Sequence, residues 1–183
     1  SYSVTGVQTC ALPISRLFVA SSSEVYQTPP LIPTPETVPL SIPDPLNPRY
    51  SYAGGKIISE LLSLNYGRSH FDRVVVFRPH NVYGPDMGYG HVVPQFVERL
   101  RQLARRPDDP LPFPIEGNGD ETRAFVYVDD FVDGLLLLRE HGEHLGIYHV
   151  GNDEETPIRV LAETIAESEE RRVGKECRSR WSP

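Results

Sequence analysis

A tyrosine and a lysine four residues apart form the part of the sequence that is best suited to proton transfer. Tyr52 and Lys56 open a stretch with helical spacing, and residues four apart on a helix lie one above the other on the same face. A free phenol has a pKa near ~10, so it is a poor base at neutral pH. A neighbouring ammonium lowers that pKa; reaching about 7 takes roughly 3 units, or about 4 kcal/mol. The spacing therefore predicts a general base.

A cluster of serines upstream, at the end of an apolar run, could complete this arrangement. A strand-end hydroxyl could hydrogen-bond the same substrate group that gives up its proton. The Y-x-x-x-K spacing alone occurs often by chance, and a tyrosine on a helix usually serves packing. The serine cluster before it and the buried strand that ends in RPHNVYGP after it favour the catalytic interpretation.

The elements that must position these residues alternate between strands and helices. The run RVVVFR is typical of a strand buried on both faces of a parallel sheet, whereas eight prolines exclude a helix or central strand between residues 28 and 48. The alternation predicts an α/β fold with a Rossmann-like, doubly wound parallel sheet. Expected strands cover 16–20, 73–78, 124–128 and 147–150, with a weaker signal at 112–117; expected helices cover 51–68, 91–103, 128–139 and 157–166; and a loop covers 80–90.

Apolar residues within the first expected helix predict which face it buries. Ile57, Leu61 and Leu64 recur at helical spacing, with Ile58 and Leu62 beside them.

Composition narrows the classes of partner. The chain has 183 residues, of which 39% are hydrophobic and 23% charged, as in an ordinary globular domain. Its formal net charge is −7, and the middle of the chain has no basic cluster, which argues against nucleic-acid binding. No apolar run is long enough to span a membrane, and the six histidines lack metal-ligand spacing. We expect neither a membrane segment nor a metal.

The two ends of the sequence look foreign to the rest. Residues 1–15 and 168–183 have no helical or strand period and contain both cysteines, Cys10 and Cys177. Both segments resemble translations of short-read sequencing adapters, so we expect them to be non-native and exclude them from fold reasoning. The alternative for the second segment is a basic, disordered tail. The native part is then expected to run from about Arg16 to Glu167.

Four motifs in order, VASSSEVY, YSYAGGK, RPHNVYGP and TRAFVYVDD, resemble the carboxyl-side motifs of extended short-chain dehydrogenases/reductases. In particular they are similar to those of the NAD-dependent epimerase/dehydratase family, which acts on nucleotide sugars. The resemblance implies that Tyr52 is the catalytic tyrosine and that Lys56 binds the nicotinamide ribose and lowers the tyrosine pKa. It places Ser22 at the catalytic Ser/Thr position and Glu24 at a carboxylate that several subfamilies use.

The same resemblance assigns ligand contacts further along the chain. Asn81 matches a residue that touches the sugar diphosphate, and Arg123 matches one that binds the diphosphate, which suits the forked guanidinium. Pro79 and Val82 would flank the nicotinamide pocket, and His91 stands where related enzymes present an asparagine.

Simpler roles remain open for four of these candidates. Glu24 could be a solvated loop carboxylate and Arg123 an exposed ion-pair partner. Asn81 could serve only the turn that follows it, and His91 could be a lone histidine at a helix start.

The sequence also departs from the family pattern. Gln27 replaces the usual glycine after Val-Tyr, and Gly55 replaces the usual serine before the lysine. No G-x-x-G-x-x-G follows an amino-terminal strand, so the pyrophosphate cradle is absent. We therefore expect an inactive fragment. Residues 16–83 would be a partial NAD-binding domain and 84–167 a small substrate-binding portion, with a returning Rossmann helix and strand at about 123–150.

For the parent protein, the resemblance implies NAD as cofactor, a nucleotide-diphosphate sugar as substrate, a cytoplasmic location and a homodimer. The first interpretation is an epimerase that works through a 4-keto intermediate. A 4,6-dehydratase or a uronate decarboxylase stays open, although Ser22-Ser23-Glu24 lacks the aspartate of the Thr-Asp-Glu string of thymidine-linked glucose dehydratases. An alternative of another class is a non-catalytic module that binds NAD or a nucleotide sugar; the retained Ser22, Tyr52 and Lys56 argue against it.

Overall fold

The structure is a computed structural model that describes residues 14–103 and 113–173. The chain divides into two compact units. The first runs to Pro79 and resumes at Asp133–Val150, and the second comprises His80–Val132 and the residues from Gly151 onward.

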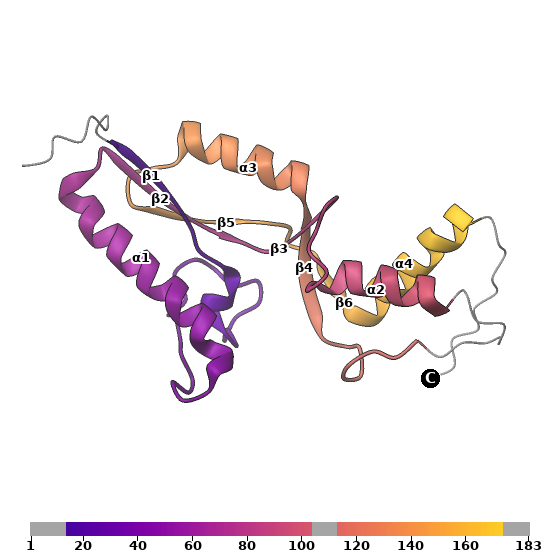
Figure 1. Cartoon of the computed structure of the whole chain (residues 1–183). Coiled ribbons are helices and arrows are strands. Elements are labelled where there is room, and N and C mark those ends of the chain that lie inside the picture. Colours follow the sequence, from indigo (N-terminus) through magenta and orange to yellow (C-terminus); the bar gives the residue numbers. More distant parts are fainter. Residues whose placement is uncertain (1–13, 104–112, 174–183) are drawn as a thin grey trace, which may run out of the picture. The chain divides into compact units, whose positions relative to one another are not determined.

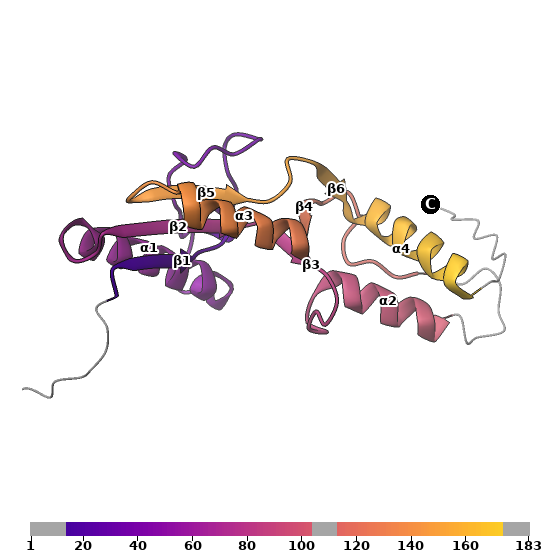
Figure 2. The ribbon, with the colours of Figure 1, turned by 90° about the horizontal axis from the view of Figure 1, so that it is seen from above.

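A three-stranded parallel sheet forms the centre of the first unit. Its strands are β1 (Arg16–Ala20), β2 (Arg73–Pro79) and β5 (Gly146–Val150), in the order β1-β2-β5. Helix α1 (Ser51–His70) lies along one face of this sheet, and the part of α3 (Val128–His141) that belongs to this unit lies along the other (Figures 1 and 2). The expected α/β class, with helices on both faces of a parallel sheet, is confirmed.

Strand β2 is buried because both of its faces are covered. Val74 and Val75 are fully buried, and successive side chains of a strand point to opposite faces. A Cβ built on Gly67 of α1 would lie 2.6 Å from Val74 Cγ2, whereas one built on Gly142, just after α3, would lie 3.1 Å from Val75 Cγ2. The two valines therefore face different helices, as the continuous apolar run predicted.

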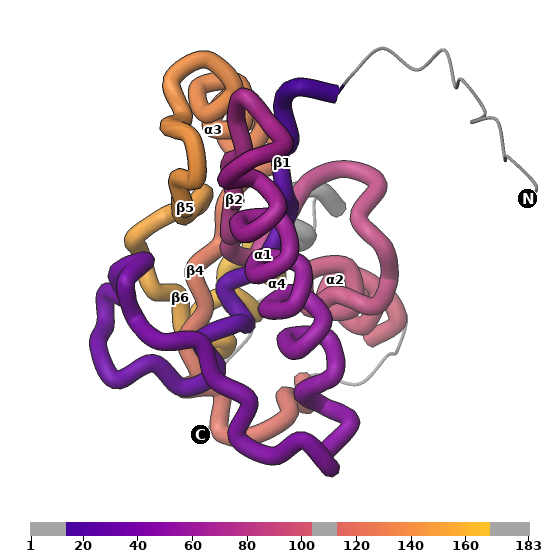
Figure 3. The backbone as a smooth tube through the Cα atoms, turned by 90° about the vertical axis from the view of Figure 1, so that its left-hand side faces the viewer, coloured from indigo at the N-terminus to yellow at the C-terminus, as the bar shows by residue number. Residues whose placement is uncertain are grey.

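The proline-rich segment is an ordered loop between two short 3₁₀ helices, η1 (Ser23–Tyr26) and η2 (Pro48–Tyr50). Figure 3 traces it between β1 and α1. Val38 from the middle of the loop joins Val25 and Tyr26 in a buried cluster, and Ser41 N–H donates to the Val25 carbonyl. The loop is thus anchored to the sheet end that carries η1.

The second unit has its own small mixed sheet. Strand β4 (Thr122–Tyr127) pairs in parallel with β3 (Asn81–Tyr83) and antiparallel with β6 (Glu155–Pro157). Helices α2 (Val92–Leu103) and α4 (Ile158–Val173) pack against each other. In the described part of the chain, no helix is both long and apolar enough to cross a membrane.

Two expectations for this second unit were wrong, and one strand was missed. Residues 80–90 were expected to be a loop, but 81–83 form β3. Strand β6 was not predicted, and 113–117 form no strand. Both missed strands have only three residues, too few to show an alternating pattern. Helix α4 was expected to end near Ala166 but continues past Glu167 to Val173.

Residues 1–13 and 174–183 lie outside the described residues. The adapter origin of the two ends therefore stays a prediction.

The buried face of α1 matches the expected one only in part. Ile57 packs against the buried cluster, and Leu64 is half-buried. Ile58, Leu61 and Leu62 are more than half exposed, whereas Ala53, Glu60 and Gly67 are buried. Small residues let the helix approach the sheet closely, and the buried carboxylate has an ion-pair partner on β2. Close packing and an ion pair, rather than the count of large apolar residues, decide which face turns inward.

The two glycines near the ends of α1 should respond oppositely to alanine. A Cβ on Gly67 would clash with the buried side chain of Val74, whereas a Cβ on Gly55 meets nothing within 4 Å. We expect Gly67→Ala to destabilise the fold by about 1–3 kcal/mol through overpacking. Gly55→Ala should stabilise it by roughly 0.5–1 kcal/mol, because alanine is the better helix former. Urea unfolding of both variants measures this, and equal signs would contradict the packing of α1 on β2.

Candidate active site

The structure brings Tyr52 and Lys56 together on the first turns of α1. Lys56 Nζ lies 5.7 Å from the centroid of the Tyr52 ring and donates a hydrogen bond of 2.8 Å to the carbonyl oxygen of Ala20, the last residue of β1. The Tyr52 side chain is about half exposed. Ser51 Oγ donates to the Pro48 carbonyl, which fixes the chain where α1 begins. An exposed phenol beside an anchored ammonium is an arrangement suited to proton transfer.

Ser22 lies just after β1 and caps η1. It is 9% exposed, and its Oγ accepts a hydrogen bond of 3.2 Å from Glu24 N–H. Beside it, Ser21 Oγ is buried and has no hydrogen-bond partner among the described residues. Glu24 is exposed, so its carboxylate role stays a prediction, as does that of Ser22.

The position where relatives were expected to have glycine adopts a backbone conformation that favours glycine. Gln27 has φ of 57°, in the left-handed region where a side chain is disfavoured. Its Nε2 donates to the Glu24 carbonyl at 2.7 Å, which closes η1 locally. The sequence departure therefore strains the loop that carries Ser22 without removing a reacting group.

The expected ligand residues of the second unit lie on β3, on β4 and before α2. Asn81 Nδ2 donates to the Ala124 carbonyl at 3.0 Å, so its amide links β3 to β4. Exposed Arg123 donates to the Thr122 carbonyl at 2.8 Å. His91 precedes α2, where its carbonyl accepts from Gln95 N–H.

The two residues expected to flank the nicotinamide belong to different units. Pro79 ends β2 and pairs with Val150, whereas Val82 pairs with Val126 in the other sheet. Ligand roles for these two, and for Asn81, His91 and Arg123, stay predictions.

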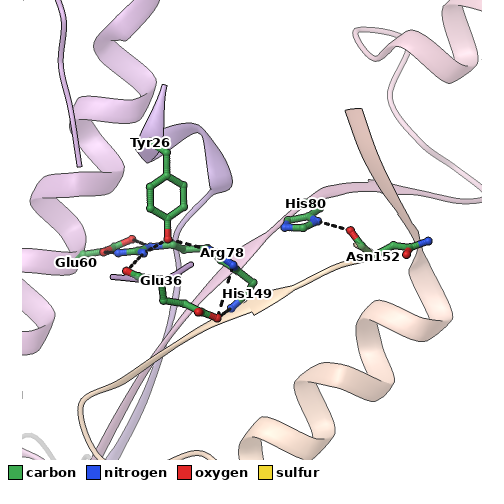
Figure 4. A network of polar contacts seen from close by, with 7 residues as sticks. All are labelled: Tyr26, Glu36, Glu60, Arg78, His80, His149 and Asn152. Atoms are coloured by element: carbon green, nitrogen blue, oxygen red, sulfur yellow. Dashed lines mark hydrogen bonds and ion pairs between the residues drawn. The ribbon is translucent and has the colours of Figure 1, made fainter. Parts of the chain in front are cut away.

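A buried polar network in the first unit was missed at the sequence level. Arg78 and Glu60 are each 2% exposed. They form a bidentate pair, with Nε–Oε1 at 2.9 Å and Nη2–Oε2 at 2.6 Å. Arg78 Nη1 also donates to the Tyr26 hydroxyl and to the Glu36 carbonyl, and the Tyr26 hydroxyl contacts His149 Nε2 at 2.8 Å (Figure 4). One guanidinium thus joins β2, α1, η1 and the proline-rich loop.

Burial, hydrogen bonds and charges within the network shift the pKa values of Tyr26, Arg78 and Glu36. Burial raises the pKa of the Tyr26 phenol above its usual range, although Arg78 opposes this shift. Burial alone would lower the pKa of Arg78, but the hydrogen bonds and charge of Glu60 raise it overall. Burial would raise the pKa of Glu36, but hydrogen bonds from the backbone N–H groups of His149 and Glu36 itself, together with the His149 charge, lower it overall.

The lowered pKa of Glu36 predicts a pH dependence of stability. A carboxyl whose pKa is lower in the folded state stabilises the fold above its unfolded pKa, here 4.5, and loses that contribution as the pH falls through the folded value. Glu36→Gln should therefore be less stable than the unmodified chain near neutral pH, and the difference should shrink below about pH 4.5. Urea unfolding across this range measures it; a difference that does not change with pH would contradict the role of the Glu36 charge.

Among the described residues, 14–103 and 113–173, no three His, Cys, Asp or Glu side chains lie close enough together to hold a metal ion.

Parallel strands with helices on both faces, and a tyrosine and lysine four apart at a helix start, are features of the short-chain dehydrogenase/reductase fold. The sequence profile of the NAD dependent epimerase/dehydratase family matches residues 6–151. This chain belongs to that family.

Curated relatives are similar over most of the chain. UDP-glucuronic acid decarboxylase 5 of Arabidopsis thaliana is 36% identical over 156 residues, which cover 84% of this chain and 43% of the relative. Five further UDP-glucuronic acid decarboxylases of the same plant match at 35–36% identity. The chain therefore spans less than half the length of these relatives.

Solved structures of related enzymes superpose well. TunA, an NAD-dependent NDP-hexosamine 5,6-dehydratase of tunicamycin biosynthesis, aligns with a TM-score of 0.70 and 27% identity over 86% of this chain and 48% of its own. The UDP-N-acetylglucosamine 4-epimerase of Methanobrevibacter ruminantium aligns with a TM-score of 0.69 and 25% identity over 90% of this chain and 48% of its own.

Proposed function

We propose that the protein containing this segment is an NAD-dependent enzyme that modifies the sugar of a nucleotide sugar, with Tyr52 as its acid–base residue. The observation that carries the proposal is the pair at the start of α1, where Lys56 Nζ lies 5.7 Å from the Tyr52 ring and is fixed to Ala20. In this role the Tyr52 phenolate accepts the proton of a sugar hydroxyl and later returns it. Ser22 would hydrogen-bond the same hydroxyl.

The residues present fit the nicotinamide end of NAD. The Lys56 ammonium has three donors, one of which goes to Ala20, so others can reach a ribose hydroxyl beside the exposed Tyr52. When bound, NAD would accept a hydride from the sugar carbon and return it. A glycine-rich turn for its pyrophosphate is not part of this sequence. We therefore propose that a preceding half of the protein supplies it.

Decarboxylation of a nucleotide-linked uronic acid is the reaction that we place first. The plant decarboxylases described above match the chain at 35–36% identity, and Ser22 before Glu24 is compatible with a uronate decarboxylase. Oxidation at C4 makes the neighbouring carboxylate part of a β-keto acid, which loses carbon dioxide readily. The enolate that remains takes up a proton from water at C5 and becomes the 4-ketone. Tyr52 would then reprotonate the C4 oxygen as the ketone is reduced.

Epimerisation, the first interpretation of the sequence, stays a prediction and is our second candidate. It is supported by the structural similarity to the UDP-N-acetylglucosamine 4-epimerase. The two reactions share the 4-keto stage and the role of Tyr52. They differ in whether the ketone is reduced on its other face or after loss of the carboxylate.

Product mass separates decarboxylation from dehydration, and NMR of the product identifies an epimer, whose mass equals that of the substrate. Flanking DNA would first provide the complete gene, and the purified protein would be incubated with NAD and, in turn, UDP-glucuronic acid, dTDP-glucose and UDP-N-acetylglucosamine. Loss of carbon dioxide from the first substrate is the expected result. Loss of water would indicate a dehydratase, and an isomer of unchanged mass an epimerase. No conversion of any nucleotide sugar would contradict the proposal.

A further inference from the structure

Lys56 and Glu60 stand four residues apart on α1, so their side chains project from the same face. Oppositely charged residues at this spacing pair readily on a helix. Here Glu60 is directed to Arg78 instead, with Oε1 accepting from Nε and Oε2 from Nη2. The Lys56 ammonium is directed instead to the Ala20 carbonyl and the Tyr52 ring.

We propose that Arg78 is a positioning residue for the reaction: by holding both oxygens of Glu60, it keeps that carboxylate away from Lys56. The inference rests on the proposed role of Tyr52 and Lys56, and it adds to that role the residue that preserves their pairing. Arg78 itself is 2% exposed, so it acts through Glu60 and Lys56 and not on a ligand.

Other contacts of Arg78 fix the orientation in which its guanidinium binds Glu60. Its third nitrogen, Nη1, is turned toward the Tyr26 hydroxyl and the Glu36 carbonyl, and its guanidinium lies 4.9 Å from the centroid of the Tyr26 ring. These contacts fix the plane of the fork, so its other two nitrogens meet the carboxylate in a bidentate geometry. A lysine could offer only a point charge to one oxygen.

Loss of Arg78 would release a carboxylate within one helical turn of Lys56. A newly formed Lys56–Glu60 pair would draw the ammonium away from Tyr52 and from the nicotinamide ribose. Misplacement of a reacting group by about 1 Å can slow a reaction on the order of a hundredfold. Substrate binding, which depends on other residues, should be nearly unaffected.

Rescue by a second substitution tests the proposal. In the complete protein, Arg78→Met should lower kcat by about tenfold to a hundredfold with KM for the nucleotide sugar changed by less than about twofold. Adding Glu60→Leu removes the competing carboxylate, and the double variant should recover most of kcat. If Arg78→Met does not fold, Arg78→Lys takes its place, because it frees one Glu60 oxygen and keeps the charge.

Two controls separate positioning from stability. Arg159→Leu removes an exposed ion pair with Asp120 and leaves the contact of Arg78 with Glu60 intact, so kcat should stay within about twofold of the unmodified value. Val75→Ala leaves a cavity on the other face of β2, so it should lower Tm without changing kcat per folded molecule. A double variant as slow as Arg78→Met, or an Arg78→Met with unchanged kcat, would overturn the inference.

Failure of the proposed function can be told from failure of this inference. If the unmodified protein converts no nucleotide sugar, the proposed function fails, and the positioning is measured on the chain itself by NMR. A nuclear Overhauser contact between the Tyr52 ring and the Lys56 side chain should weaken in Arg78→Met and return in the double variant. An unchanged contact in Arg78→Met would overturn the inference independently of activity.

Discussion

Replacing Tyr52 by phenylalanine should abolish turnover of the complete protein and leave ligand binding nearly intact. The change removes only the hydroxyl that we propose as proton acceptor, and an acid–base group of this kind contributes about 10²–10⁴-fold to rate. The ring and its contact with Lys56 remain, so the site should keep its shape. Steady-state kinetics measure kcat, and calorimetric titration measures affinity for NAD and for the nucleotide sugar separately.

Arg123→Ala is the matched control, because its expected effects are the reverse. It removes a charge-assisted contact to the diphosphate, which we estimate at about 1.5–3 kcal/mol, and should weaken nucleotide-sugar affinity roughly tenfold to a hundredfold. NAD affinity should hardly change. If Arg123→Ala weakens the binding of NAD and of the nucleotide sugar equally, Arg123 has a structural role. Normal turnover by Tyr52→Phe would exclude Tyr52 as the acid–base residue.

Glu60→Leu alone should be among the most destabilising single substitutions in the chain. It leaves the buried charge of Arg78 without its partner, and breaking a buried pair from one side typically costs about 3–5 kcal/mol. Replacing both partners, as in Glu60→Leu with Arg78→Met, removes the uncompensated charge, so most of the stability should return. Urea unfolding of the unmodified chain, the single variant and the double variant gives their free energies of unfolding.

An exposed ion pair provides the comparison. Arg159 Nε and Asp120 Oδ1 lie 3.2 Å apart, and both side chains are more than half exposed, so Arg159→Leu should change stability by less than about 1 kcal/mol. If Glu60→Leu is no more destabilising than Arg159→Leu, the pair between α1 and β2 is not the stabilising contact that its burial indicates.

Elements with a strong local pattern could be predicted from the sequence. The run RVVVFR indicated β2, and the expected helix from Ser51 differs from α1 by two residues at its end. The strands β3 and β6 could not be predicted, because each has only three residues and depends on pairing with β4. Such pairing is a tertiary contact that no local spacing encodes.

The candidate site could also be predicted only in part. Spacing on one helix was enough to place Tyr52 beside Lys56, whereas the partner of Glu60 lies on a strand 18 residues away in sequence. One signal could have found it: Arg78 follows four apolar residues near the end of β2, and an arginine buried in such a strand requires a charged partner. The identity of that partner still depends on which face of α1 turns inward, and large exposed residues such as Leu61 masked that face.

The proline-rich segment has a consequence for the unfolded chain. Its eight prolines between residues 28 and 48 have φ fixed near −65° even before folding, so this segment has fewer conformations to lose than an ordinary loop of its length. Each compatible proline lowers the entropic penalty of ordering by about 0.4–1 kcal/mol. The segment that brings Glu36 to the Arg78 network is therefore partly preorganised. Replacing a proline by alanine should destabilise the fold in part through the denatured state, even where backbone hydrogen bonds such as that from Ser41 N–H to the Val25 carbonyl remain.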